Sequence, residues 1–158
     1  MSGRVDVLLV DDDRDEVDVA LRALQRSGVD ASVAVARDGQ EALEALGLEG
    51  DGEVRAPRPA VVLLDLKMPR VDGLEVLRRI RAADAIADVP VVVLSSSDRE
   101  ADVERCYALG ANSFVVKRHD ARSPGAYIAE AVRYWLSLNQ PPPARAREGR
   151  GREPRWRD

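Results

Sequence analysis

The chain has 158 residues, 45% of them hydrophobic and 33% charged, and its 28 acids against 24 lysines and arginines give a net charge of −4. This fits one globular domain with an ordinary core, while a single cysteine excludes an intramolecular disulfide framework and a single histidine argues against His-based metal or triad chemistry. No stretch approaches the roughly 20 apolar residues of a membrane span, and the start leaves no room for a signal peptide, so we expect a cytoplasmic protein.

Short β-branched runs alternate with longer segments whose apolar residues recur at helical spacing, and the order strand then helix occurs five times. The helix after the first strand carries apolar residues on one face, a spacing that buries one side of a helix against a sheet. The predicted strands are 5–10, 31–36, 60–64, 91–94 and 113–116, and the apolar face of the first helix consists of Val17, Ala20, Leu21 and Leu24.

Capping residues mark the starts of the second and third helices. Asp38 and Glu41 have the spacing of a capping box, and Asp72 before Gly73 is a predicted N-cap. The third helix then presents an apolar stripe to the core. This stripe consists of Val76, Leu77 and Ile80.

The fourth and fifth helices have similar patterns. Gly110 is predicted to end the fourth helix. The fifth is predicted to begin with Ser123 as N-cap and Pro124 at the first helical position. The predicted inward residues are Val103, Cys106 and Tyr107 in the fourth helix, and Ile128, Ala131, Val132, Trp135 and Leu136 in the fifth.

Parallel strands need crossover connections, which are right-handed almost without exception, so the alternation predicts a doubly wound α/β sandwich. The strand order does not follow from the periodicity. Residues 47–59 are predicted to be a surface loop insertion because glycines and prolines occur throughout. Residues 139–158 hold a proline cluster, six arginines and almost no apolar residues, so a folded domain at 1–138 and a disordered tail at 139–158 are expected.

Acidic residues follow two of the predicted strands. Asp11, Asp12 and Asp13 follow the first, and Asp65 follows the third. Ligands bind at the carboxyl ends of strands in an open parallel sheet, so Asp11, Asp12 and Asp65 converge if these strands are neighbours. At about 4 Å each pair repels by roughly 1 kcal/mol in water and about 4 kcal/mol at an effective dielectric of about 20. The cluster therefore requires protons, a lysine or a divalent cation, and hard oxygen ligands favour Mg²⁺.

Polar residues also end the other two strands that reach this edge. Ser95 follows the fourth strand, and Lys117 follows the fifth. A carboxylate, a hydroxyl and an ammonium at one metal site suit phosphoryl transfer to Asp65, with Ser95 and Lys117 binding phosphoryl oxygens. Asp13 is expected to begin the first helix and face solvent there.

With these residues in this order, the sequence resembles the receiver domains of bacterial two-component response regulators over about residues 5–138. The resemblance implies the flavodoxin-like strand order 2-1-3-4-5, which makes the first and third strands neighbours. The matching parts are Asp11-Asp12, Asp65-Leu66-Lys67-Met68-Pro69, Asp72-Gly73, Ser95 and Lys117.

The resemblance also implies roles at the metal site. Asp65 would be the phosphoacceptor. Asp12 would bind Mg²⁺ directly and Asp11 mostly through water, with the backbone carbonyl of Lys67 as a further ligand.

Three more residues have roles by the same resemblance. Ser95 would supply the hydroxyl that swings toward the phosphoryl group, and Lys117 would be the ion-pair partner of that group. Phe114 matches the aromatic switch position, although it has no hydroxyl. Arg118 stands where most receivers have a proline joined to the lysine by a cis peptide, which a non-proline residue forms only at a cost of about 3 kcal/mol.

A narrower resemblance is to stand-alone receivers that partner bacterial phytochrome histidine kinases. It rests on the insertion before the third strand, the stretch Pro90 to Ser97, and Tyr134-Trp135-Leu136 before a proline cluster. A sensor histidine kinase is then the expected partner, with an unknown downstream protein reached by contacts or phosphorelay. Tyr134 and Leu138 favour a homodimer through the face formed by the fourth helix, fifth strand and fifth helix, and no membrane or direct DNA binding is expected.

The enzyme alternative is a metal-dependent phosphatase with an aspartyl nucleophile at Asp11. It rests on the Asp-x-Asp pattern of Asp11 and Asp13, which resembles the start of haloacid-dehalogenase-type hydrolases. A flavodoxin-like nucleotide or flavin binder is a third class, but the chain has no glycine-rich phosphate loop after a strand. We therefore expect a phosphoacceptor rather than an enzyme.

Overall fold

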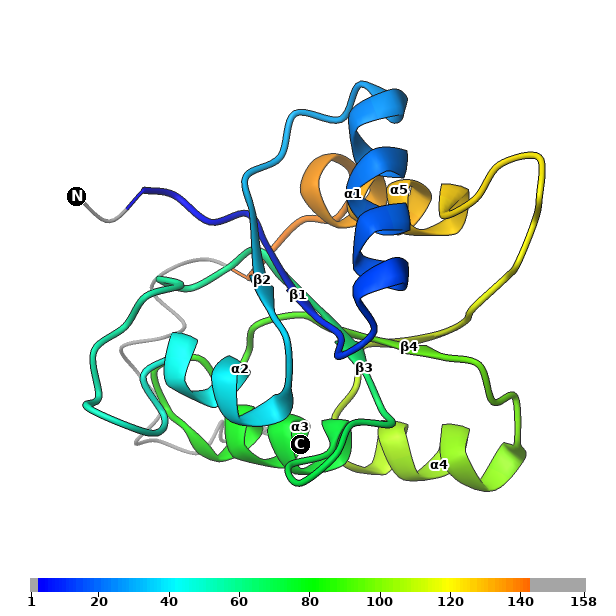
Figure 1. Ribbon diagram of the computed structural model, residues 1–158. Helices are drawn as coiled ribbons and strands as arrows, with labels where there is room; N and C mark the ends of the chain where they lie inside the picture. Colours follow the sequence, from blue (N-terminus) through cyan, green and yellow to red (C-terminus); the bar gives the residue numbers. More distant parts are fainter. Residues whose placement is uncertain (1–2, 143–158) are drawn as a thin grey trace, which may run out of the picture.

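The computed structural model describes residues 3–142, which form a parallel sheet in the order β2-β1-β3-β4-β5 with helices on both faces (Figure 1). In Figure 1, α1 and α5 cover one face and α2, α3 and α4 cover the other. The elements are β1 (Val7–Val10), α1 (Arg14–Ser27), β2 (Val33–Ala36), α2 (Gly39–Ala45), β3 (Val61–Asp65), α3 (Gly73–Ala82), β4 (Val91–Ser95), α4 (Glu100–Ala108), β5 (Ser113–Val116), α5 (Ala126–Arg133) and the π-helical turn η1 (Tyr134–Leu138). The predicted fold class and strand order are confirmed.

The central strands are buried on both faces because each is a continuous apolar run. In β1, Leu8 and Val10 belong to the core cluster that includes residues of α2, α3 and α4, whereas Val7 and Leu9 belong to the cluster that includes residues of α1 and α5. This two-residue alternation is the geometry of a strand, whose successive side chains point to opposite faces. The sheet is therefore the rigid middle layer from which the strand-end residues project.

The predicted acidic caps are confirmed. The Asp38 side chain accepts a hydrogen bond from Glu41 N at 2.7 Å, and Asp72 accepts one from Glu75 N at 3.0 Å. Asp13 is the N-cap of α1. Each cap of this kind stabilises a helix by about 1 kcal/mol.

The predicted start of α5 is wrong. The helix begins at Ala126, with Gly125 as N-cap in the left-handed region at φ 74, and Ser123 and Pro124 lie in the preceding turn. A Cβ on residue 125 would lie 3.0 Å from Ala23 Cβ, so the close packing of α5 on α1 requires glycine there. The serine and proline pattern gave no information on this contact, which is made by a distant helix.

In α4 the predicted apolar stripe is wrong at one position. Cys106 is fully buried, as predicted, but Tyr107 is 49% exposed. The helix packs only a narrow side against the sheet, and Cys106 is the residue of α4 that is buried. The side chain next to Cys106 therefore faces solvent.

The segment 47–59 is a loop, as predicted. It is attached to α2, because the backbone N–H groups of Arg55 and Ala56 both donate to Ala45 O, and Ala56 is buried. Within residues 3–142 no helix is long and apolar enough to cross a membrane. The predicted tail lies outside the described residues from residue 143 onward.

Candidate functional site at the carboxyl edge of the sheet

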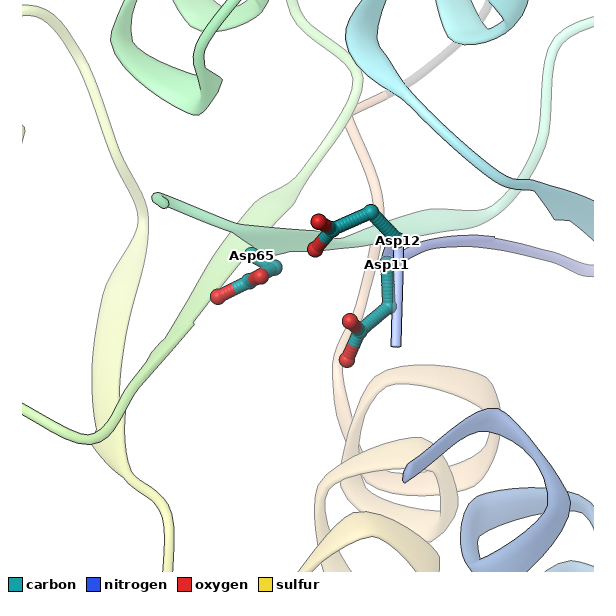
Figure 2. Close-up of side chains that lie close together, drawn as sticks. All are labelled: Asp11, Asp12 and Asp65. Carbon is teal, nitrogen blue, oxygen red and sulfur yellow. The ribbon is translucent and has the colours of Figure 1, made fainter. Parts of the chain in front are cut away.

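Three carboxylates meet where β1 and β3 end. Val10 pairs with Leu64, so the residues that follow these two in the chain, Asp11 and Asp65, reach the same level of the sheet. Each of Asp11, Asp12 and Asp65 offers an oxygen within 4.8 Å of the others, and Figure 2 shows the three side chains grouped at the two strand ends. The convergence predicted for these acids is confirmed.

Burial makes this cluster costly to charge. Asp11 and Asp65 are 5% and 7% exposed, whereas Asp12 is exposed. Burial raises the pKa of Asp11 to about 7, against the opposing effects of the Asp13 N–H and the Lys117 ammonium. Burial likewise raises the pKa of Asp65, again opposed by Lys117. A compensating cation is therefore needed for all the carboxylates to ionise together.

A divalent cation fits the donor set. Three carboxylates from two adjacent strand ends offer hard oxygen ligands, one side of the group is open at exposed Asp12, and one side is closed at buried Asp11 and Asp65. Mg²⁺, Mn²⁺ and Ca²⁺ all accept such ligands. The geometry therefore supports a divalent metal site without selecting among these ions.

Lys117 lies against this carboxylate group. Its Nζ is 3.3 Å from Asp65 Oδ1 and 3.4 Å from Asp11 Oδ2, and its side chain is 7% exposed. Burial opposes the charged ammonium, but the surrounding carboxylates, including Glu16, outweigh burial and raise the pKa of Lys117 above its usual range. The ammonium of Lys117 is therefore held beside Asp65, and its role as ion-pair partner of a phosphoryl group stays a prediction.

The peptide bond between Lys117 and Arg118 is trans, although most receivers have a cis proline at this place. No cis peptide bond occurs within residues 3–142, so Lys117 and Arg118 are joined in trans. The Lys117 N–H donates to Ser95 O at 2.7 Å, which extends the pairing of β5 with β4 by one residue. The sheet thus positions the backbone of Lys117.

Glu16 is a site residue that sequence reasoning missed. Its carboxylate accepts a hydrogen bond from Lys117 Nζ and forms an ion pair with it. Glu16 is in the first turn of α1, four residues before buried Ala20, so it lies on the face of the helix that packs on the sheet. That spacing was the signal available in the sequence, because it directs an acid toward the strand ends.

Ser95 ends β4 beside Asp65, which pairs with Leu94 on that strand. Ser95 is 2% exposed, and its hydroxyl accepts a hydrogen bond from Ser97 N at 3.1 Å. The exposed side chain of Lys67 lies two residues beyond Asp65. Ser95 therefore borders the site, and the carbonyl role of Lys67 stays a prediction.

Phe114 lies on β5, three residues before Lys117, and pairs with Val93. It is partly buried against the core cluster that includes α2, α3 and α4 residues. It is not part of the carboxylate group. Its switch role stays a prediction.

The sequence model of the response regulator receiver domain matches residues 7–125. Among curated proteins, the probable methanogenesis regulatory protein FilR2 of Methanothrix harundinacea is 36% identical over 136 residues, covering 86% of each chain. Response regulator Rcp1 of Synechocystis is 33% identical over 130 residues, covering 82% of this chain and 88% of Rcp1.

Solved structures agree with these matches. The Mn²⁺-bound form of Rcp1 has a TM-score of 0.77 at 32% identity, covering 89% of this chain and all of that one. The phosphorylated cyanobacterial phytochrome response regulator RcpA has a TM-score of 0.79 at 33% identity with the same coverage. The bacteriophytochrome response regulator RtBRR has a TM-score of 0.68 at 43% identity, covering 92% of this chain and 90% of that one.

Proposed function

The chain belongs to the response regulator receiver domain family, and from this we propose that it accepts a phosphoryl group on Asp65 from a histidine kinase. The observation that carries the proposal is the meeting of three carboxylates with one buried ammonium, since Lys117 Nζ lies 3.3 Å from Asp65 Oδ1. The phosphorylated structure of RcpA supports it, because that relative is a receiver in the phosphorylated state.

In the proposed reaction, an oxygen of the Asp65 carboxylate attacks phosphorus and forms an acyl phosphate. The bond between phosphorus and the donor breaks, and its electron pair leaves with the donor histidine or, for a small acyl phosphate, with the carboxylate leaving group. Attack requires ionised Asp65, whose pKa is raised by burial and lowered by Lys117. Lys117 therefore favours the ionised form of the nucleophile and lies where it can bind a phosphoryl oxygen.

Asp11, Asp12 and Asp65, with the Lys67 carbonyl, are the proposed ligands of Mg²⁺. When bound, the ion neutralises charge on the transferring phosphoryl group. The Mn²⁺-bound form of Rcp1 supports a divalent site in this family, and the grouping of the three carboxylates supports it in this chain. Asp11 and Asp12 thereby serve a nucleophile on the neighbouring strand.

Phosphorylation is proposed to act as a two-state switch. The hydroxyl of Ser95, now an acceptor for Ser97 N, would turn to donate to a phosphoryl oxygen, and this movement would let Phe114 rotate. The phosphoryl group shifts the equilibrium only by its different interactions with the two states. The surface formed by α4, β5 and α5 would then carry the signal.

The proposed partners follow from the relatives and from this surface. RtBRR and RcpA are named as phytochrome response regulators, which supports a bacteriophytochrome histidine kinase as the donor. The output is proposed to pass by protein contacts or phosphorelay, with Mg²⁺ as cofactor and no enzymatic activity on other substrates. Co-purification with a light-sensing histidine kinase, and phosphotransfer from it to wild type but not to Asp65→Asn, tests the donor.

Phosphorylation itself is tested with purified protein, Mg²⁺ and acetyl phosphate, followed by intact mass measurement. Wild type is expected to gain the mass of one phosphoryl group, and Asp65→Asn to gain none. In the phosphatase alternative Asp11 is the nucleophile, and Asp13 is the second acid of the Asp-x-Asp pattern. In the structure Asp13 caps α1, and its Oδ1 accepts a hydrogen bond from Asp15 N at 2.9 Å. An adduct that persists in Asp65→Asn and disappears in Asp11→Asn would overturn the proposal in favour of that alternative.

A further inference from the structure

Lys117 has three carboxylate neighbours, and they differ in kind. Asp11 and Asp65 belong to the group of acids that fits a divalent cation. Glu16 is outside that group, and its carboxylate accepts a hydrogen bond from Lys117 Nζ. Glu16 thus contacts the ammonium without belonging to the proposed metal ligands.

We propose that Glu16 is a positioning residue that holds the Lys117 ammonium beside Asp65 during phosphoryl transfer. The inference rests on the proposed function, since it assigns Lys117 a part in that reaction. It adds a residue to the site that neither the receiver resemblance nor the strand-end pattern contains.

The other two partners of Lys117 are engaged during the reaction. A divalent cation at Asp11, Asp12 and Asp65 would draw on the charge of those carboxylates, and phosphorylation converts the Asp65 carboxylate into an acyl phosphate. Glu16 is neither among the proposed metal ligands nor the residue that phosphorylation converts. It therefore remains available to Lys117 through both.

The backbone at Lys117 does not fix the direction of the lysine side chain. Lys117 is followed by Arg118 in a trans peptide, so no proline ring orients the lysine. The strand pairing fixes only its backbone, through the hydrogen bond from Lys117 N to Ser95 O. A lysine side chain has several rotatable bonds, so the direction of the ammonium depends on its partners.

The start of α1 supplies a rigid support for Glu16. The Asp13 cap accepts a hydrogen bond from Glu16 N at 3.3 Å, and Val17 next to Glu16 is buried. The Glu16 side chain is 32% exposed, so the ion pair is partly screened at its outer end but enclosed at the lysine end. The contact therefore joins a fixed helix start to a fixed strand end.

The test compares Glu16→Gln with Asp15→Asn. Both remove one negative charge from the first turn of α1, but Asp15 is exposed and makes no side-chain contact with Lys117 among the described residues. At saturating Mg²⁺, the rate constant for phosphorylation by acetyl phosphate is expected to fall about five- to tenfold in Glu16→Gln and to stay within about twofold in Asp15→Asn. Equal losses of rate in the two variants would mean that the effect comes from the net charge of the helix start, and would overturn the proposal.

A double-mutant cycle with Lys117→Met tests whether Glu16 acts through the lysine. Once Lys117 is replaced, adding Glu16→Gln is expected to change the rate by less than about twofold, because the interaction is already absent. A further five- to tenfold loss in the double variant would overturn the positioning role. Thermal unfolding of all variants checks that they fold.

The outcome also separates this inference from the proposed function. If wild type gains no phosphoryl group, the proposed function fails and the lysine has no reaction to serve. If wild type is phosphorylated on Asp65 and Glu16→Gln reacts at the wild-type rate, the function stands and the role of Glu16 is refuted.

Discussion

The carboxyl group of Asp65 lies where the fold disfavours charge. Its pKa is raised by burial, so above the unfolded-state pKa the ionised group opposes folding. Lys117 offsets part of this effect but also has Asp11 and Glu16 as partners. Replacing Asp65 with asparagine removes the buried charge and leaves the lysine paired.

We therefore expect Asp65→Asn to be as stable as wild type or more stable in EDTA at pH 7, by up to about 2 kcal/mol. Mg²⁺ should stabilise wild type in proportion to its binding and stabilise the variant less. Urea unfolding with EDTA and with Mg²⁺ measures both effects. Asp18→Asn, an exposed acid of α1, is the control and should respond to Mg²⁺ as wild type does; a clear loss of stability in Asp65→Asn without metal would contradict the charge argument.

At the scale of elements, the contact between α1 and α5 depends on one glycine. Gly125 and Gly28 both have left-handed backbones, at φ 74 and φ 73. They differ in their surroundings: a Cβ at Gly28 would meet nothing within 4 Å, whereas one at Gly125 would lie 3.0 Å from Ala23 Cβ and 3.1 Å from Val19 O. Substitutions at these two glycines therefore separate the effect of backbone strain from that of steric crowding.

Gly28→Ala is expected to lower the free energy of unfolding by about 1 kcal/mol, from backbone strain alone. Gly125→Ala should lower it by a further 1 to 3 kcal/mol or so, because α5 must also move away from α1. Chemical unfolding of both variants measures the difference. Equal losses would mean that the helices are not in close contact at this position.

At the scale of the molecule, α4 and β5 carry exposed apolar side chains. Tyr107 on α4 and Val116 on β5 are 49% and 37% exposed, on the face proposed for the homodimer. Phosphorylation is expected to favour a dimer there, and a charge introduced on that face should oppose it.

Sedimentation of the protein with acetyl phosphate and Mg²⁺ tests this. Wild type is expected to shift toward dimer, and Tyr107→Glu to weaken the dimer at least about tenfold. Val54→Glu changes an equally exposed apolar residue in the loop 47–59 and should leave the equilibrium unaltered. A Tyr107→Glu protein that dimerises normally would move the interface to another surface.

Much of this molecule was predictable because its signals are local. Apolar runs that end in Asp11, Asp65, Ser95 or Lys117 indicate both the parallel sheet and the edge where these residues meet. The strand order came only from the receiver resemblance, since periodicity does not report which strands are neighbours. The start of α5 was mispredicted because it depends on the packing of Gly125 against α1, about a hundred residues away in the chain. Local capping preferences do not report such a contact.

Glu16 illustrates the same limit inside the site. An acid in the first turn of a helix is favoured by the helix dipole alone, so its type is explained without any partner. Only the packing of α1 on the sheet brings its carboxylate to Lys117. Contacts between side chains of distant elements are therefore what the structure adds to the sequence.

The loop 47–59 has a practical consequence. It joins α2 to the amino end of β3, and Asp65 is at the carboxyl end of that strand, so the loop lies at the opposite edge of the sheet from Asp65. Its tip, Gly50 to Gly52, is exposed to solvent, and doubling a loop's length costs only about 0.6 kcal/mol in closure entropy. This tip is where a fluorescent reporter or affinity label can be inserted to follow signalling without disturbing the chemistry.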